Sequence, residues 1–181
     1  LYTEYLFGKE AGADYVIGTR KAFDNDIPVI GDYGVNRDGS GDMYYKGANM
    51  LHTIRQLVNN DSTWKSFLRD INKKFWHTTT TSKEVEEFMS GYLKMDLSKV
   101  FDQYLRTIKI PVLEYYWKGD VLMFHWTNCV PGFNMPVRVN VGTDNLLLRP
   151  AEKQSSLRGS KAITVTVDRN YCVDIKKVDK K

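Results

Sequence analysis

The sequence predicts an α+β protein in which helices come first and short strands follow. Apolar residues recur at helical spacing between residues 45 and 105, and brief apolar runs bounded by turn residues fill residues 112–178. The change falls at Lys109-Ile110-Pro111, because a proline disfavours helical backbone at the residue before it. We therefore expect two domains, residues 1–109 and residues 110–181.

The helical part is expected to begin with a helix from Tyr2 to Ile17. The chain opens on Leu1 rather than on methionine and looks cut from a longer protein, so we expect this helix to have started upstream. Further helices are predicted from apolar stripes, most of them preceded by capping residues. The stripes are Tyr45, Met50, Leu51, Ile54, Leu57 and Val58; Trp64, Phe67, Leu68, Ile71 and Phe75, after Asn60-Asp61-Ser62; Val85, Phe88, Met89 and Tyr92, opened by Ser82; and Val100, Phe101, Tyr104 and Leu105, after Asp96-Leu97-Ser98.

A long irregular stretch, Asn25 to Asp42, separates the first helix from the next. Loops of this length without secondary structure are uncommon unless they are functional, so we expect either an ordered loop near the functional face or a mobile one. Its glycine spacing matches neither of the two common phosphate-binding loops. Its aspartates lack the ligand pattern and the following glutamate of a calcium loop, which favours a solvated loop. The residues concerned are Gly31, Gly34, Gly39 and Gly41, and Asp24, Asp26, Asp32, Asp38 and Asp42.

Roughly six or seven short strands are predicted in the second part, which is typical of a small immunoglobulin-like β-sandwich. Hairpin turns are indicated at Lys118-Gly119-Asp120, Gly142-Thr143-Asp144 and Asp168-Arg169-Asn170. Aromatic residues alternate along the first hairpin, so some of them are expected to fill the core. They are Tyr115, Tyr116, Trp117, Phe124 and Trp126. The strand segments are Val112 to Trp117, Val121 to Trp126, Pro136 to Val141, Asn145 to Leu148, Ala162 to Val167 and Cys172 to Val178.

Composition excludes some classes of function. The chain has 181 residues, of which 42% are hydrophobic, enough for a real core. Its net charge is +4 and its Lys and Arg residues are scattered apart from the tail, so no nucleic-acid partner is expected. No run approaches the roughly 18 apolar residues of a membrane span, and the first residues carry no targeting signal, which leaves the compartment open. Cys129 and Cys172 lack CxxC spacing, so free buried thiols are expected, with one disulfide as the alternative.

The segment Asp42-Met43-Tyr44-Tyr45-Lys46-Gly47 resembles the Tyr-x-Lys-Gly helix start of the gluzincin zinc aminopeptidases, the family of membrane alanyl aminopeptidase and leukotriene hydrolase. The order of elements that follows is similar to that family's, through Phe67-Leu68 and Asp96-Leu97 to Pro111, where a β-sandwich domain opens. The stretch Glu4 to Gly8 also looks like the helix after the family's third zinc ligand. The resemblance covers nearly the whole chain. It implies the helical subdomain of a thermolysin-like catalytic domain followed by the β-sandwich.

The resemblance also implies a function: the C-terminal part of a zinc metallo-aminopeptidase that removes N-terminal residues from peptides. In that family, zinc is held by an HExxH helix and a downstream glutamate. The histidines are His52, His77 and His125, and no two are four residues apart, so this chain is expected to bind no zinc and to be inactive alone. Zinc and the peptide substrate are expected in the intact parent. A helix face that packs against the absent lobe is expected to be an exposed apolar patch.

Tyr44 is the one catalytic residue that the resemblance carries over to this chain. It matches the family tyrosine whose hydroxyl donates a hydrogen bond to the oxyanion of the tetrahedral intermediate, a task that suits a phenol because phenols are protonated at neutral pH. Gly47 is expected to permit close helix packing and Lys46 to pair locally, without a firm role. Taken without the family, Tyr44 beside Tyr45 is aromatic packing at a helix start. The alternative function is therefore a non-catalytic scaffold or binding module with the same architecture.

Overall fold

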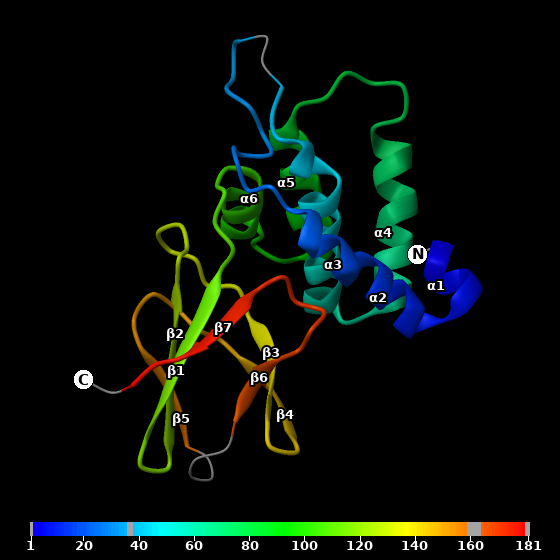
Figure 1. Cartoon of the computed structure of the whole chain (residues 1–181). Helices are drawn as coiled ribbons and strands as arrows, with labels where there is room; N and C mark the ends of the chain where they lie inside the picture. The colour runs from blue at the N-terminus through cyan, green and yellow to red at the C-terminus, as the bar shows by residue number, and fades with distance from the viewer. Residues whose placement is uncertain (1, 36–37, 159–163, 180–181) are drawn as a thin grey trace.

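A computed structural model describes residues 2–35, 38–158 and 164–179 (Figure 1). Helices occupy the first part of the chain and strands the second, which confirms the predicted α+β class. The change from helix to strand lies between Leu105 and Val112, while the division into two domains at residue 109 stays a prediction. Among the helices of the described residues, none has the length and apolar content that crossing a bilayer requires. The helices are α1 (Tyr2–Phe7), α2 (Lys9–Gly18), α3 (Tyr45–Val58), α4 (Asp61–Lys74), α5 (Ser82–Leu93) and α6 (Ser98–Leu105), with 3-10 turns η1 (Thr19–Ala22) and η2 (Gly41–Met43).

The opening segment is two helices, so the prediction of one helix from Tyr2 to Ile17 is wrong. Gly8 separates α1 from α2 with a φ of 90°, a backbone conformation that glycine adopts without steric cost. The chain turns back there, and Gly12 of α2 lies against Glu4 of α1. A Cβ built on Gly12 would be 2.7 Å from the Glu4 Cβ, so a glycine is needed for this close approach.

The starts of α4 and α5 are fixed by side-chain caps. Asn60 accepts a hydrogen bond from the Thr63 N–H, as its capping chemistry predicted. The cap of α5 is Thr81, which exchanges hydrogen bonds with Glu84 in a capping box, rather than Ser82. Thr81, the last residue of the Thr78 to Thr81 run, therefore stabilises the start of α5.

The buried face of α3 is largely polar, which its apolar stripe did not predict. Met50 and Ile54 are buried as expected, but Tyr45 is 45% exposed and Leu51 is 36% exposed. In their place α3 buries polar and charged side chains, each of which requires hydrogen-bonding partners away from water. These residues are Lys46, Asn49, Thr53 and Arg55.

The strands form two sheets. They are β1 (Val112–Lys118), β2 (Val121–Thr127), β3 (Val137–Val141), β4 (Asp144–Leu148), β5 (Ser155–Arg158), β6 (Val165–Val167) and β7 (Asp174–Lys177). Within the described residues, one sheet has the order β5-β2-β1-β7 and the other the order β4-β3-β6. All neighbours are antiparallel except β1 and β7, which are parallel.

Two of the predicted hairpins are confirmed and one is wrong. Gly119 and Gly142, with φ of 64° and 62°, turn the β1–β2 and β3–β4 hairpins. The Asp168-Arg169-Asn170 turn instead leads the chain from β6 in one sheet to β7 in the other. β5 was not predicted, because its residues are mostly exposed and carry no apolar alternation. Residues 162 and 163 of the predicted strand from Ala162 to Val167 lie outside the described residues.

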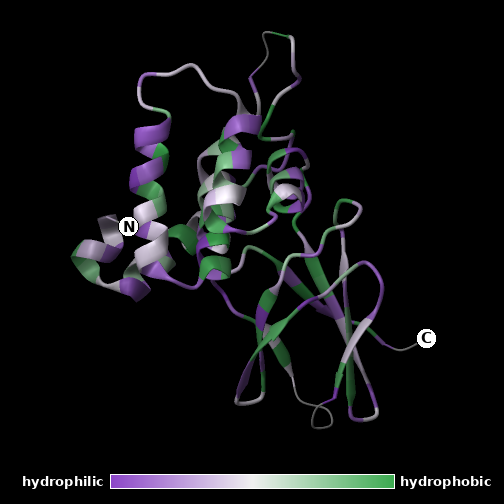
Figure 2. Ribbon diagram, turned by 180° about the vertical axis from the view of Figure 1, so that it is seen from behind, coloured by the Kyte–Doolittle hydropathy of each residue, from purple (hydrophilic) through white to green (hydrophobic). Residues whose placement is uncertain are grey.

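One apolar core joins the helices and the two sheets. Tyr104 of α6, Leu113 of β1 and Val139 of β3 are fully buried in the same cluster, and hydrophobic residues are spread through both parts of the chain (Figure 2). The aromatic alternation was predicted correctly, since Tyr115, Phe124 and Trp126 are buried. Each such side chain contributes about 1.5–3 kcal/mol to folding. The immunoglobulin-like sandwich itself stays a prediction.

Cys129 and Cys172 are free thiols, as the spacing indicated. Burial raises the pKa of the Cys129 thiol to about 12 and that of the Cys172 thiol to about 11. Both sulfurs are therefore protonated at neutral pH, and neither is a reactive thiolate.

Candidate functional site

Tyr44 lies on the surface, directly before α3. Its side chain is 70% exposed, and its hydroxyl makes no hydrogen bond within the described residues. Met43 and Tyr45 on either side are also exposed, at 52% and 45%. The backbone of Tyr44 is already helical, with φ −74° and ψ −59°. The structure thus presents an unpaired phenol at the start of a helix, where it is available to donate a hydrogen bond.

The turn before Tyr44 is held by a buried carboxylate. Asp42 is 2% exposed, and its two oxygens accept hydrogen bonds from the backbone N–H groups of Asp24 and Asn25, at 3.0 and 2.9 Å. Ser40 accepts from the Asp42 N–H and donates to the Asp26 carboxylate at 2.7 Å. The prediction of a solvated loop is wrong for Asp42, because backbone N–H groups replace water around its charge.

The first turn of α3 is held by a buried lysine. Lys46 is 0% exposed, and its Nζ donates to the Asn25 side-chain oxygen at 3.0 Å and to the Thr107 carbonyl oxygen at 2.9 Å. Burial lowers the pKa of Lys46, and the nearby Asp42 charge opposes that shift. Asn25, Asp42, Lys46 and Thr107 together form what we term the α3 anchor.

Sequence reasoning missed the α3 anchor. A usable signal was present, since an Asp and a Lys four residues apart flank Tyr44 at a helix start. Their common partner, Asn25, carried no signal of its own. The expected role of Gly47 in close packing is wrong, because nothing lies within 4 Å of a Cβ built there.

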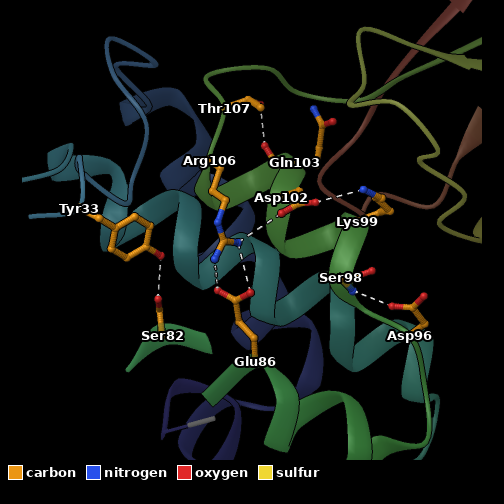
Figure 3. A network of polar contacts seen from close by, with 10 residues as sticks. All are labelled: Tyr33, Ser82, Glu86, Asp96, Ser98, Lys99, Asp102, Gln103, Arg106 and Thr107. Carbon is orange, nitrogen blue, oxygen red and sulfur yellow. Dashed lines mark hydrogen bonds and ion pairs between the residues drawn. The ribbon is translucent and has the colours of Figure 1, made fainter. Parts of the chain in front are cut away.

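The described part of the loop from Asn25 to Asp42 is tied to the helices beside it. The Ile30 N–H donates to the Leu105 carbonyl oxygen at 2.9 Å. The Tyr33 hydroxyl lies 3.0 Å from the Ser82 hydroxyl at the start of α5 (Figure 3). These contacts favour the first of the two expectations, an ordered loop that leads into the Tyr44 turn.

The segment around Thr107, whose carbonyl oxygen accepts the Lys46 hydrogen bond, is held by further contacts. Arg106 makes a two-pronged contact with the Glu86 carboxylate at 2.7 and 3.2 Å, and the Thr107 hydroxyl donates to the Gln103 carbonyl oxygen at 2.7 Å (Figure 3). The Glu86 hydrogen bond raises the pKa of Arg106. The carbonyl of Thr107 therefore offers Lys46 an acceptor whose position is set by α5 and α6.

A cavity of about 570 Å³ follows the Tyr44 face of α3. Tyr44, Ala48, Leu51 and Arg55 succeed one another at spacings of four, three and four, so they lie on one side of the helix. Ala48, Leu51 and Arg55 line the cavity, and Tyr44 is not among its lining residues. Glu4, Tyr15, His52 and Asn170 also line it.

Arg55 ties α3 to α1 and α4. Its guanidinium donates to both Glu4 oxygens at 2.6 and 3.0 Å, and its Nε donates to Asp61 at 2.9 Å. These hydrogen bonds raise the pKa of Arg55 and, from the other side, lower the pKa of Glu4. Arg55 lines the cavity with its charge fully paired.

The histidines lie apart from one another and have structural partners. The His52 Nε2 lies 2.9 Å from the Asn170 side-chain oxygen. His77 packs edge-on against Trp76, and His125 lies 3.8 Å from Glu114. Among residues 2–35, 38–158 and 164–179, no group of three or more His, Cys, Asp or Glu could hold a metal ion.

α1 exposes large apolar side chains. None of its residues is buried, and Tyr2, Tyr5 and Phe7 are 77%, 85% and 72% exposed. Tyr15 of α2 is 67% exposed and lines the same cavity as Tyr2. The apolar patch that was expected on a helix face packed against an absent lobe stays a prediction.

By fold, the chain is similar to a part of a solved aminopeptidase. The structure concerned is that of Legionella pneumophila aminopeptidase A in complex with aspartic acid, with a TM-score of 0.64 and 12% sequence identity. The match covers 98% of this chain and 22% of that one, so the chain spans about a fifth of the aminopeptidase's length. No family model and no curated protein matches the chain. At this identity the likeness concerns the fold, which is aminopeptidase-like.

Proposed function

We propose that the chain is the C-terminal part of a zinc metallo-aminopeptidase that hydrolyses N-terminal residues from peptides. Residues 1–109 would be the helical subdomain of its thermolysin-like catalytic domain, and residues 110–181 an immunoglobulin-like β-sandwich. The fold likeness supports this together with the Tyr-x-Lys-Gly segment. The observation that carries the proposal is the unpaired, exposed hydroxyl of Tyr44 at the start of α3.

Tyr44 is the group of this chain that acts in the reaction. When water attacks the scissile carbonyl, negative charge develops on the carbonyl oxygen, and the Tyr44 hydroxyl donates a hydrogen bond to it. A donor of this kind is typically worth about 10²- to 10³-fold in rate. Because the charge is greatest in the transition state, the hydroxyl acts on kcat more than on KM.

The metal belongs to another part of the intact protein. By the order of motifs in that family, the zinc ligands and the residue that activates water would lie upstream of Leu1. The exposed apolar side chains of α1 are consistent with a further lobe packed against them. Residues 1–181 alone would then hydrolyse nothing.

The test is the metal content and activity of the intact protein. We expect about one tightly bound zinc per chain and hydrolysis of aminoacyl amides that is lost on chelation and restored by zinc. Residues 1–181 alone serve as the control and should show neither. An intact protein that is free of metal and inert would support the scaffold or binding module instead.

A further inference from the structure

Lys46 is an unusual residue to find without any exposed surface. Lysine is among the residues least often fully buried, and moving its charge away from water is unfavourable unless partners replace the water. Its ammonium has two hydrogen-bond acceptors, both neutral, while the Asp42 carboxylate acts on it only through its charge. A methionine would fill similar space without that penalty. The lysine therefore calls for an explanation other than packing.

Asp42 and Lys46 lie on either side of Tyr44 in the sequence, and both hydrogen-bond to Asn25. Asp42, two residues before Tyr44, accepts the Asn25 backbone N–H, and Lys46, two residues after it, donates to the Asn25 side chain. Asn25 has a φ of 47°, in the left-handed region, so both contacts act on a residue with a defined and strained backbone. The backbone segment that carries Tyr44 is thus attached to Asn25 both before and after Tyr44.

The second acceptor of Lys46 fixes the direction of the first helical turn. The Thr107 carbonyl is held by α5 and α6 through the Glu86–Arg106 pair and the Gln103 carbonyl (Figure 3). A rotation of α3 about its axis or a shift along it would break the Lys46–Thr107 bond. The same motion would displace the hydroxyl of Tyr44, which makes no hydrogen bond to the described residues that could hold it in place.

We infer that Lys46 is a positioning residue, whose ammonium sets where the Tyr44 hydroxyl stands. This inference rests on the proposed function, because it acts only through the catalytic role of Tyr44. Lys46 does not touch the substrate. Its loss leaves the phenol present but displaced, and a displacement near 1 Å lowers a rate by roughly 10- to 100-fold.

The test is a double-mutant cycle in the intact protein, with kcat and KM measured for Lys46→Met, Tyr44→Phe and both together. We expect Lys46→Met to lower kcat roughly 10- to 100-fold with little change in KM. In the Tyr44→Phe background, Lys46→Met should leave kcat nearly unchanged, since the hydroxyl it positions is gone. Equal losses of kcat in the two backgrounds, or none in the wild-type background, would overturn the inference. A Tyr44→Phe protein with full kcat would instead overturn the proposed function.

Two further variants separate positioning from stability. Thr53→Val removes a buried hydroxyl on the same helix that contacts Cys172 instead of the α3 anchor, so it should lower stability and leave kcat unchanged. Asn25→Gly retains the left-handed backbone and removes only the side-chain acceptor of Lys46. If Lys46→Met fails to fold, Asn25→Gly should show the same non-additivity with Tyr44→Phe, and additive losses would overturn the inference.

Discussion

Lys46 and Thr107 are 61 residues apart in sequence, and the Lys46 ammonium donates a 2.9 Å hydrogen bond to the Thr107 carbonyl oxygen. The bond joins the first turn of α3 to the segment between α6 and β1. The start of the helix that presents Tyr44 is therefore fixed to the place where the helices give way to the strands. Substitutions in this region should change both the free energy of unfolding and the position of the Tyr44 side chain.

Asp42→Ala should destabilise the chain by about 1–3 kcal/mol. The change removes the buried carboxylate that accepts the N–H groups of Asp24 and Asn25, and losing hydrogen bonds to a charged acceptor has a cost of this size. Asp38→Ala is the matched control, because Asp38 is an exposed aspartate of the same loop. Urea unfolding measures the free energy, and equal values for the two variants would contradict the role of Asp42.

Gly39→Ala and Gly41→Ala should differ although they are two residues apart. A Cβ at Gly39 would lie 2.0 Å from the Val29 carbonyl oxygen, so the loop must open to accept it. A Cβ at Gly41 meets nothing within 4 Å. We expect Gly39→Ala to lower the unfolding free energy by about 1–3 kcal/mol and Gly41→Ala to leave it nearly unchanged. Thermal melting of the pair checks this, and indistinguishable Tm values would argue against a tightly packed loop.

The Glu4–Arg55 pair should make stability fall in acid. The hydrogen bond from Arg55 holds the folded-state pKa of Glu4 below its ordinary value of 4.5, so folding favours the ionised carboxyl. The resulting stability is complete above about pH 4.5 and is lost as the pH falls through the lowered folded pKa. We expect Glu4→Gln to lower the unfolding free energy by about 1–3 kcal/mol at pH 7.

The pH series supplies its own check. The difference between wild type and Glu4→Gln should shrink as the pH falls from 4.5 through the lowered folded-state pKa of Glu4, because protonation removes the charge that folding favours. Glu87→Gln serves as the control, since Glu87 pairs with Lys83 on the surface of α5. A difference for Glu4→Gln that stays constant from pH 7 to pH 3 would rule out ionisation as the source of its effect.

Thr53 should couple α3 to the strands through its hydroxyl. The hydroxyl accepts the Cys172 N–H at 2.9 Å and donates to the Asn49 carbonyl oxygen at 2.9 Å. Thr53→Val conserves the shape and leaves the buried Cys172 N–H unpaired, at a cost of about 1–3 kcal/mol. Thr53→Ser retains the hydroxyl and should be less damaging. Urea unfolding measures the free energy of unfolding of both variants. A larger loss for Thr53→Ser than for Thr53→Val would contradict this coupling.

Local signals in the sequence predicted much of the fold. Asn60 caps a helix because its side chain reaches an N–H three residues on, and Gly119 turns a hairpin because it tolerates a positive φ. Alternation correctly placed Phe124 and Trp126 in the core, because neighbouring side chains on a strand face opposite ways. Each of these features depends on residues close together in the chain.

The polar face of α3 could not be predicted in this way. Asn49 donates to the Val16 carbonyl oxygen, 33 residues away, and Lys46 to partners 21 and 61 residues away. A periodic pattern favours apolar residues for a buried face, and it therefore placed Leu51 inside in error. The break at Gly8 and the polar strand β5 were missed because neither disturbs such a pattern.

The catalytic role of Tyr44 was predicted from a family resemblance rather than from a periodic pattern. Periodicity treats it as one more aromatic residue at a helix start, and only the Tyr-x-Lys-Gly context gives it a chemical role. The structure adds that its side chain is exposed and unpaired. Tyr45, its neighbour, is also an exposed tyrosine and offers a matched comparison.

The most direct test of the catalytic role compares Tyr44→Phe with Tyr45→Phe in the intact protein. Each change removes one hydroxyl from an exposed tyrosine at the start of α3. We predict that Tyr44→Phe lowers kcat for aminoacyl amide hydrolysis by about 10²- to 10³-fold with little change in KM, and that Tyr45→Phe leaves kcat close to wild type. A Tyr44→Phe protein with the kcat of wild type would contradict the role assigned to Tyr44.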